Sequence, residues 1–183
     1  GWYCRILDRI TDCPTGKILE VGSGGGFLKL LRNDVITSDI LPLPHCDMAF
    51  SADKLPFSEN ELSAIVMTDT FHHLPNCEQF LNEASRTLKQ GGKLVMIEPS
   101  NTLLGRLIYK NLHNEQFDTN GSWQFPASGP LSGANGALPW IVFTRDRELF
   151  LKKFPVLKIQ SIKLHTPFLY LLSGGLSHNI PLP

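Results

Sequence analysis

The chain has 183 residues, of which 42% are hydrophobic and 19% are charged, which predicts one folded domain and excludes a disordered chain. Its 17 basic residues balance its 17 acidic ones, so the composition gives no sign of a general polyanion-binding protein and we expect no nucleic-acid partner. No apolar run approaches the roughly 18 residues of a membrane span, so we expect no stable membrane insertion.

The first hundred residues alternate short apolar runs with helical patterns. Apolar spacing predicts helices over residues 2–10, 27–31 and 75–89. The predicted strands are short apolar or β-branched runs at residues 17–21, 34–38, 46–50, 63–67 and 93–97. Nearly continuous apolar strands separated by helices are typical of a parallel sheet covered on both faces. We therefore expect an α/β fold with a doubly wound, mostly parallel sheet.

The pattern loosens after residue 100. Residues 103–112 are compatible with a helix, and residues 120–139 are rich in Gly, Ser, Asn and Pro and have no clear period. A helix is predicted over 144–153, with Thr144 as its N-cap and two lysines in its last turn. Residues 156–164 alternate apolar and polar side chains, which predicts a sixth strand.

These elements suggest how the chain is organised. We expect a single domain over residues 1–183, with its core at 16–100. The segment 101–140 follows the fifth predicted strand, where folds of this kind commonly insert a substrate cover, and long loops without regular structure are uncommon unless functional or mobile. We predict such a cover here, and a surface excursion that buries its own aromatic side chains is the open alternative. A helix and a strand over 144–165 would close the domain, and the apolar tail that follows residue 165 is left unassigned.

The four cysteines are Cys4, Cys13, Cys46 and Cys77. No two of them have the CxxC spacing of a zinc site, and a domain with this much apolar material does not need a disulfide framework. We interpret them as free thiols, which favours a cytoplasmic location.

The most informative segment is ILEVGSGGGFL, residues 18–28, in which a strand ends in glycines and a helix follows. Glycines allow positive φ and a close approach of the backbone to a ligand. In open α/β sheets, ligands bind at the carboxyl ends of the strands, where this loop lies. Gly22, Ser23, Gly24 and Gly26 are therefore the first candidate binding residues.

The loop does not fit two common nucleotide motifs. A dinucleotide fingerprint needs Gly or Ala five positions after Gly22, where this chain has Phe27, and the Lys-Ser/Thr pair of a P-loop is missing. Glu20, just before the loop, would repel a pyrophosphate but suit an ammonium group. Asp39, at the end of the second predicted strand, is placed to accept hydrogen bonds from ribose hydroxyls.

The remaining pattern, E-x-G-x-G-x-G, resembles motif I of class I S-adenosylmethionine-dependent methyltransferases. Three further stretches resemble the methyltransferase type 11 family in the same order: SADKLPF at 51–57, TDTFHHL at 68–74 and GGKLVMIEPS at 91–100. The resemblance covers about residues 16–100. It implies a Rossmann-like sheet, which here lacks its last strand if only six are present, and S-adenosyl-L-methionine as cofactor with S-adenosyl-L-homocysteine as product.

The resemblance also implies roles for individual residues. Asp53 would accept from the adenine amino group, although its gap to the LPF motif is short, and Thr68 would lie beneath the cofactor. The complete set of expected cofactor-binding residues is Glu20, Gly22, Ser23, Gly24, Gly26, Asp39, Ile40, Asp53, Lys54, Leu55, Thr68 and His73.

The implied reaction is in-line methyl transfer to a small-molecule acceptor, which needs mainly positioning and the exclusion of water. His72 is the first candidate for a catalytic base, and Glu98 is the second. For each, a purely structural role is an open alternative. We expect no metal, because adjacent histidines lack the i, i+4 spacing of a helical zinc motif and no third ligand is evident.

Two other functions stay open. A non-catalytic domain that binds S-adenosylmethionine as a sensor or scaffold would keep the glycine loop and not need His72 or Glu98. An NAD-dependent oxidoreductase is disfavoured by Phe27. The acceptor and the oligomeric state, for which a dimer is one option, do not follow from the sequence.

Overall fold

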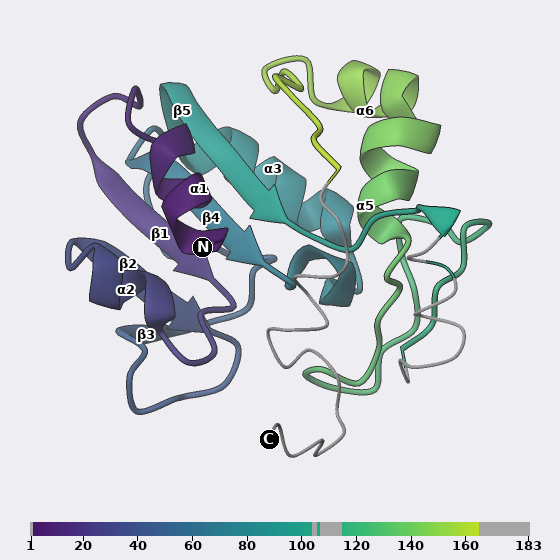
Figure 1. The fold of residues 1–183 in the computed structure, drawn as a ribbon, viewed down its shortest axis with the longest axis horizontal. Helices are drawn as coiled ribbons and strands as arrows, with labels where there is room; N and C mark the ends of the chain where they lie inside the picture. The colour runs from purple at the N-terminus through teal and green to yellow at the C-terminus, as the bar shows by residue number, and fades with distance from the viewer. Residues whose placement is uncertain (1, 104–105, 107–114, 165–183) are drawn as a thin grey trace, which may run out of the picture.

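A five-stranded parallel sheet forms the centre of the computed structural model, which describes residues 2–103, 106 and 115–164 (Figure 1). The strands run in the spatial order β3-β2-β1-β4-β5, and every neighbouring pair is parallel. Their bounds are β1 Lys17–Val21, β2 Val35–Asp39, β3 Met48–Ala49, β4 Leu62–Thr68 and β5 Leu88–Ile97. The α/β fold with a doubly wound parallel sheet is thus confirmed.

Helices cover both faces of this sheet. They are α1 Trp2–Arg9, α2 Phe27–Leu31, the 3-10 turn η1 Phe71–His73, α3 Cys77–Thr87, α5 Leu138–Trp140, the π-helical turn η2 Ile141–Arg145 and α6 Arg147–Lys153. Figure 1 shows α1 in front of the sheet, α3 behind it, and α5 and α6 in green beyond the arrowhead of β5. This arrangement leaves little of the central strands in contact with water.

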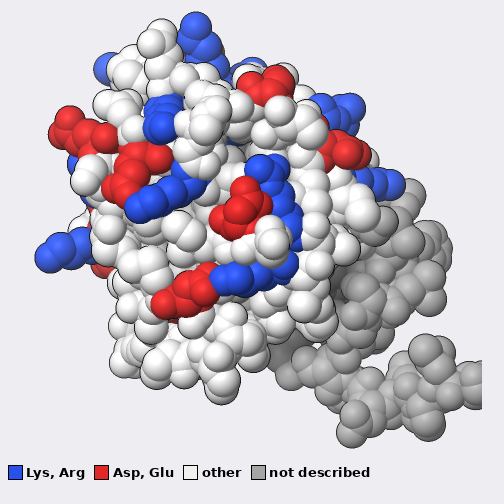
Figure 2. Space-filling model, turned by 90° about the vertical axis from the view of Figure 1, so that its left-hand side faces the viewer, with Lys and Arg blue, Asp and Glu red and all other residues white. Residues whose placement is uncertain are grey.

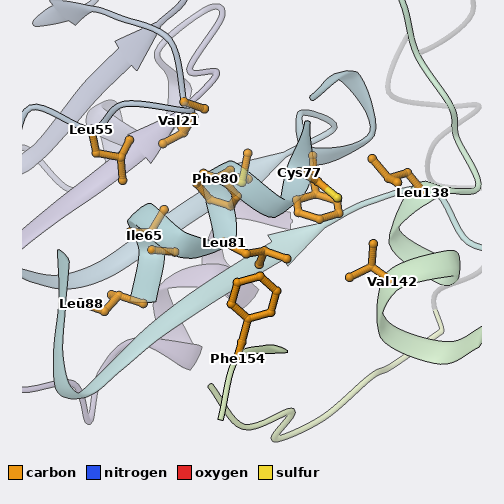
Figure 3. Packing of buried hydrophobic residues seen from close by; sticks show 14 of the residues in the cluster. Val21, Leu55, Ile65, Cys77, Phe80, Leu81, Leu88, Leu138, Val142 and Phe154 are labelled. Carbon is orange, nitrogen blue, oxygen red and sulfur yellow. The ribbon is translucent and has the colours of Figure 1, made fainter. Parts of the chain in front are cut away.

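Two hydrophobic clusters fill the spaces between helices and sheet. Alternate residues of β4 point to opposite faces, so Ala64 and Val66 join the cluster beneath α1 and α2, whereas Ile65 and Met67 join the larger cluster that includes α3. Figure 3 shows that Phe80 and Leu81 of α3 lie in this larger cluster, which Val142 and Phe154 also join. Burial on both faces explains why the strands are almost continuously apolar.

Helix α3 also fixes the loop that follows β3. The helix begins where the Asn76 side chain accepts a hydrogen bond from Gln79 N at 3.2 Å. Near its end, Arg86 donates to the carbonyls of Phe57 (2.8 Å) and Leu55 (3.2 Å), while Glu83 accepts from Leu55 N (2.8 Å). Because both partners of the Arg86–Glu83 pair bond to the loop backbone, residues 55–57 are held against α3.

Two predictions about the second half are wrong. Residues 156–164 form no strand: Leu157 and Ile159 do pack against the core, but their backbone pairs with no neighbouring strand. Only Leu157 and Ile159 of the alternating residues pack on the core, whereas Val156, Ile162 and Leu164 are exposed. Thr144 is not an N-cap either, because it lies inside η2; α6 begins after Asp146 instead, and Lys152 and Lys153 occupy its last turn as expected.

The strand expected over 17–21 and the helix expected over 27–31 form with the predicted ends, and several other elements form with shifted ends. The predicted helix over 75–89 ends at Thr87, and β5 begins at once, five residues earlier than expected, and continues through the glycines at 91 and 92. Most of the helix expected at 103–112, and the tail after 165, lie outside the described residues. All four cysteines are free thiols, as expected. In the part of the chain that is described, no helix is both long and apolar enough to cross a membrane.

Candidate functional site

The glycine loop joins β1 to α2 and is tied to β2. Gly22, Gly24 and Gly26 all have positive φ, at 70°, 48° and 68°, which only glycine adopts without strain. Ser23 N donates to Ser38 O at 2.9 Å, and the Ser23 hydroxyl accepts from Ser38 N at 3.0 Å. The loop is therefore anchored at its centre to the end of β2.

Gly22 and Gly24 differ in how much space lies beside the backbone. A Cβ atom at Gly22 would lie 2.3 Å from Thr70 Oγ1, so the Thr70 side chain already fills that space. A Cβ atom at Gly24 would meet no atom of the described residues within 4 Å. Asp39 Oδ2 accepts from Gly24 N at 3.2 Å, and Asp39 Oδ1 accepts from Leu41 N at 3.1 Å. The loop thus packs on Thr70 at one end and opens to a free space beside Asp39 at the other.

Glu20 is a buried carboxyl group at the end of β1. Its side chain has 2% exposure, and its Oε2 atom has no hydrogen-bond partner among the described residues. Burial raises the pKa of Glu20 to about 7, against a smaller opposite effect of Ser23. Thr68 Oγ1, at the end of β4, is also buried without a partner there. Two unpartnered polar atoms at adjacent strand ends fit a ligand that brings hydrogen-bond donors.

Several expected cofactor residues do not join this group. Asp53 and Lys54 are exposed, and among the described residues no hydrogen bond or ion pair joins their side chains to the glycine loop. Leu55 is buried in the core that includes α3, and Ile40 is 40% exposed. The 51–57 loop is connected to the end of β2 through the backbone. Phe50 N donates to Asp39 O at 3.0 Å, so this loop starts beside Asp39.

Glu98 organises the loop between β4 and α3. Its Oε1 accepts from Thr70 N at 2.9 Å and from Phe71 N at 2.7 Å, and its Oε2 lies 2.7 Å from His72 Nδ1. Thr70 in turn bonds through its hydroxyl to Gly22 O at 3.5 Å. One carboxylate at the end of β5 therefore fixes η1 and, through Thr70, the first half of the glycine loop.

A second carboxylate, Glu115, faces both histidines from the far side. Its oxygens lie 3.3 Å from His72 Nε2 and 3.6 Å from His73 Nε2. Burial alone would lower the pKa of His72, but the carboxylates of Glu115 and Glu98 beside its ring outweigh that effect and raise the pKa to about 10. Burial and the neighbouring His72 lower the pKa of His73. Burial, and then Glu98, raise the pKa of Asp69 to about 6.

Asn135 ties the second half of the chain to this loop. Its backbone N–H donates to His72 O at 2.9 Å, and its side chain accepts from Asp118 N (3.0 Å) and donates to Asp118 O (2.9 Å). Gly136 N donates to Gln116 O at 2.9 Å. Through these bonds residues 116–118 are held against η1, and Glu115 is placed beside the histidines.

We expect Asn135→Ala to destabilise the fold by about 1–3 kcal/mol, because it leaves the partly buried backbone N–H and C=O of Asp118 without the Asn135 side chain as partner. Urea unfolding measures this loss. Asn120→Ala is the matched control, since Asn120 is exposed and its side chain makes no such bond to any described residue. Equal stability of the two variants would contradict the role assigned to Asn135.

Three residues of the site were missed in the sequence. Thr70 lies in a recognised motif, but its contact with Gly22 depends on tertiary packing. Glu115 and Asn135 lie in or beside the aperiodic segment after β5, where no local pattern marks them. Only the position of that segment, after the fifth strand, pointed to a role near the site.

Comparisons with known proteins point to one family. Residues 19–96 match the family model described as a methyltransferase domain. A demethylmenaquinone methyltransferase of Symbiobacterium thermophilum is 28% identical over 95 residues, covering 52% of this chain and 38% of that protein. The ubiquinone/menaquinone biosynthesis C-methyltransferase UbiE of Azotobacter vinelandii is 37% identical over 96 residues, covering 51% and 38%.

The chain thus spans about two fifths of the length of these curated relatives. Among solved structures, a SAM-dependent methyltransferase of Thermotoga maritima, described as a possible histamine N-methyltransferase, is 25% identical with a TM-score of 0.48, covering 61% of this chain and 58% of that one. The aligned regions of the curated relatives cover about half of this chain.

Proposed function

Since residues 19–96 form a class I S-adenosylmethionine-dependent methyltransferase domain, we propose that this chain binds S-adenosylmethionine at the glycine loop and transfers its methyl group to a small-molecule acceptor. The bound cofactor supplies an electrophilic methyl group and leaves as S-adenosylhomocysteine. A small acceptor agrees with the names of the curated relatives, which are methyltransferases of quinone biosynthesis.

Glu20 is the observation that carries this proposal. A carboxyl group with 2% exposure and an unpartnered oxygen is costly to bury unless a ligand supplies the missing donor. An ammonium group would do so and would favour the ionised carboxylate. Asp39 can accept from ribose hydroxyls, and the free space at Gly24 lets a ligand approach the backbone.

The remaining cofactor assignments follow the family resemblance. We propose Gly22, Ser23 and Gly26 as the loop backbone around the ligand, and Thr68 and His73 as its wall on the β4 side. Asp53 and the backbone of Lys54 and Leu55 would line the adenine end, together with Ile40. These residues follow β2 and β3, next to Asp39.

For His72 the geometry favours positioning over proton abstraction. Carboxylates lie at both ring nitrogens, and a histidine with a pKa near 10 holds its proton at neutral pH. We therefore propose that His72 and Glu98 hold the η1 loop in place, and that methyl transfer depends mainly on alignment.

Calorimetric titration with S-adenosylmethionine, S-adenosylhomocysteine and NAD tests the proposal. We expect binding of the two sulfur nucleosides, loss of that binding in Asp39→Ala, and no binding of NAD. Asp8→Ala, an exposed acid on α1, is the matched control and should bind as the unchanged chain does. Binding of NAD alone, or of none of the three, would overturn the proposal.

The location is a separate proposal. The four free thiols suit a reducing compartment, which supports the cytoplasm.

On the face shown in Figure 2, Lys and Arg side chains are mixed with Asp and Glu, so that face presents no basic patch to a nucleic acid.

A further inference from the structure

The two histidines of η1 form a cluster with Glu115, a carboxylate to which the proposed methyl transfer gives no role. One ligand atom from each of His72, His73 and Glu115 can be chosen so that all lie within 4.8 Å of one another. His72 is fully buried, and the other two are partly buried. Two imidazole nitrogens and one carboxylate are the donor set of catalytic zinc sites and of 2-His-1-carboxylate centres.

We propose that His72, His73 and Glu115 bind a divalent transition-metal ion of the Zn²⁺ type. The proposal goes beyond methyl transfer, because none of the expected cofactor contacts needs an ion at this place. It also departs from the expectation based on sequence spacing, in which no third ligand could be named. Glu115 can be identified as that ligand only in the folded chain, where Asn135 bonds both to His72 and to Asp118 and so brings Glu115 next to the histidines.

The first argument is the orientation of both imidazole rings. His72 Nδ1 lies 2.7 Å from Glu98 Oε2, and His73 Nδ1 lies 3.4 Å from the Gly133 carbonyl oxygen. Each Nδ1–H can therefore donate to an oxygen, and a metal ion at His72 Nε2 would take the place of the proton there. Metal-binding histidines are commonly oriented in this way by a carboxylate or a carbonyl.

The second argument is distance. Both Nε2 atoms face Glu115, whose oxygens lie at 3.3 Å from His72 and 3.6 Å from His73. A tetrahedral ion with ligands at roughly 2.0–2.2 Å separates its ligands by roughly 3.4 Å. The two separations involve different oxygens of Glu115, and both are close to this value, so small side-chain rotations would bring the three residues around one ion.

The third argument is rigidity. Glu98 accepts from two backbone N–H groups, of Thr70 and Phe71, as well as from His72. The carboxylate that orients His72 is therefore itself held in place. On the other side, Asn135 N donates to His72 O. A site whose ligands are fixed by such outer contacts needs little rearrangement to accept an ion.

The position suggests what the ion would do. Three protein ligands leave coordination positions open, as in catalytic zinc sites. Thr70, two residues before His72, contacts Gly22 of the glycine loop. This role of the ion rests on the proposed function: an open coordination position would bind an oxygen atom of the methyl acceptor close to the cofactor.

Calorimetric titration of the chelator-treated chain with Zn²⁺ tests the site. We expect one equivalent to bind, and Glu115→Gln to weaken binding by more than the 10–100-fold that loss of an outer partner costs. His73→Gln should have the same effect. Glu148→Gln, an exposed acid on α6, is the matched control. Mg²⁺, which prefers oxygen ligands, should not compete.

Absorption spectra of the Co²⁺-loaded chain distinguish this site from one made by the free cysteines. We expect d–d bands of a nitrogen- and oxygen-ligated ion without thiolate charge-transfer bands. Thiolate bands, or Zn²⁺ affinity unchanged in Glu115→Gln and His73→Gln, would overturn the proposal. Binding of S-adenosylmethionine is measured on the unchanged chain and on Glu115→Gln, which alters no proposed cofactor contact, so a failed metal site and a failed cofactor site give different results.

Discussion

Glu20→Gln is expected to weaken S-adenosylmethionine binding and at the same time to stabilise the ligand-free chain. Removing one partner of a buried charged pair costs about 2 kcal/mol or more, which corresponds to at least about 30-fold in affinity. Calorimetric titration of the variant measures this loss. The opposite effect on stability follows from the burial of Glu20 in the absence of a ligand.

The effect on stability depends on pH. Burial raises the pKa of Glu20 from 4.5 to about 7 in the folded chain. Below pH 4.5 the carboxyl is neutral in both states, and it costs the fold nothing. Between the two values the folded state binds the extra proton, so the free energy of unfolding falls as the pH rises. Above pH 7 the full penalty, at most about 3 kcal/mol, is present.

Urea unfolding of both chains at pH 4 and pH 8 tests this. We expect Glu20→Gln to match the unchanged chain at pH 4 and to exceed it by up to about 3 kcal/mol at pH 8. Glu148→Gln should show no such gap between the two pH values, because Glu148 is exposed. If the free energy of unfolding changed with pH in the same way for Glu20→Gln and the unchanged chain, burial of the ionised Glu20 carboxylate would carry no cost.

The second large effect is a difference in stability between alanine variants of two glycines in the same loop. Gly22→Ala and Gly24→Ala both force alanine into a positive-φ conformation, at a cost of about 1–2 kcal/mol each. Only the Gly22 variant meets a neighbour, since its Cβ would lie 2.3 Å from Thr70 Oγ1. We expect Gly22→Ala to be less stable than Gly24→Ala by about 1–3 kcal/mol in urea unfolding.

The affinity for S-adenosylmethionine should not follow the stability of Gly22→Ala and Gly24→Ala. Gly24→Ala places a methyl group in the free space proposed for the cofactor, so the variant should fold and yet bind S-adenosylmethionine poorly. Adding Thr70→Ala to Gly22→Ala should recover part of the lost stability, because it removes the two closest atoms. If Gly24→Ala bound the cofactor normally, the ligand would lie elsewhere.

What could be predicted from the sequence was local in origin. Runs such as KILEV and SAIVM carry their own period and composition, so β1 was predicted with its observed bounds and β4 to within one residue at each end. The glycine loop, Glu20 and Asp39 were found because the carboxyl ends of parallel strands share one edge. All of these features depend on contacts between neighbouring residues or neighbouring strands.

What could not be predicted depends on contacts between distant parts of the chain. Residues 156–164 can form a strand only if the folded chain places them alongside an edge strand such as β5, and the alternating pattern does not report that placement. Glu115 and Asn135 act on His72 from the segment after β5, and no periodicity records such a contact. The unusual pKa of His72 depends on both carboxylates and could not be inferred from adjacent histidines.

The position of β1 in the sheet has a consequence for how the chain folds. β1 lies between β2 and β4, so this early strand has no second neighbour until residue 62 has been made. Parallel pairing across such separations requires long loops to close first, which slows folding. The glycine loop is completed later still, by Thr70 and Glu98. The binding site therefore forms only when the sheet is nearly complete, and a nascent or partly folded chain has no cofactor to stabilise it.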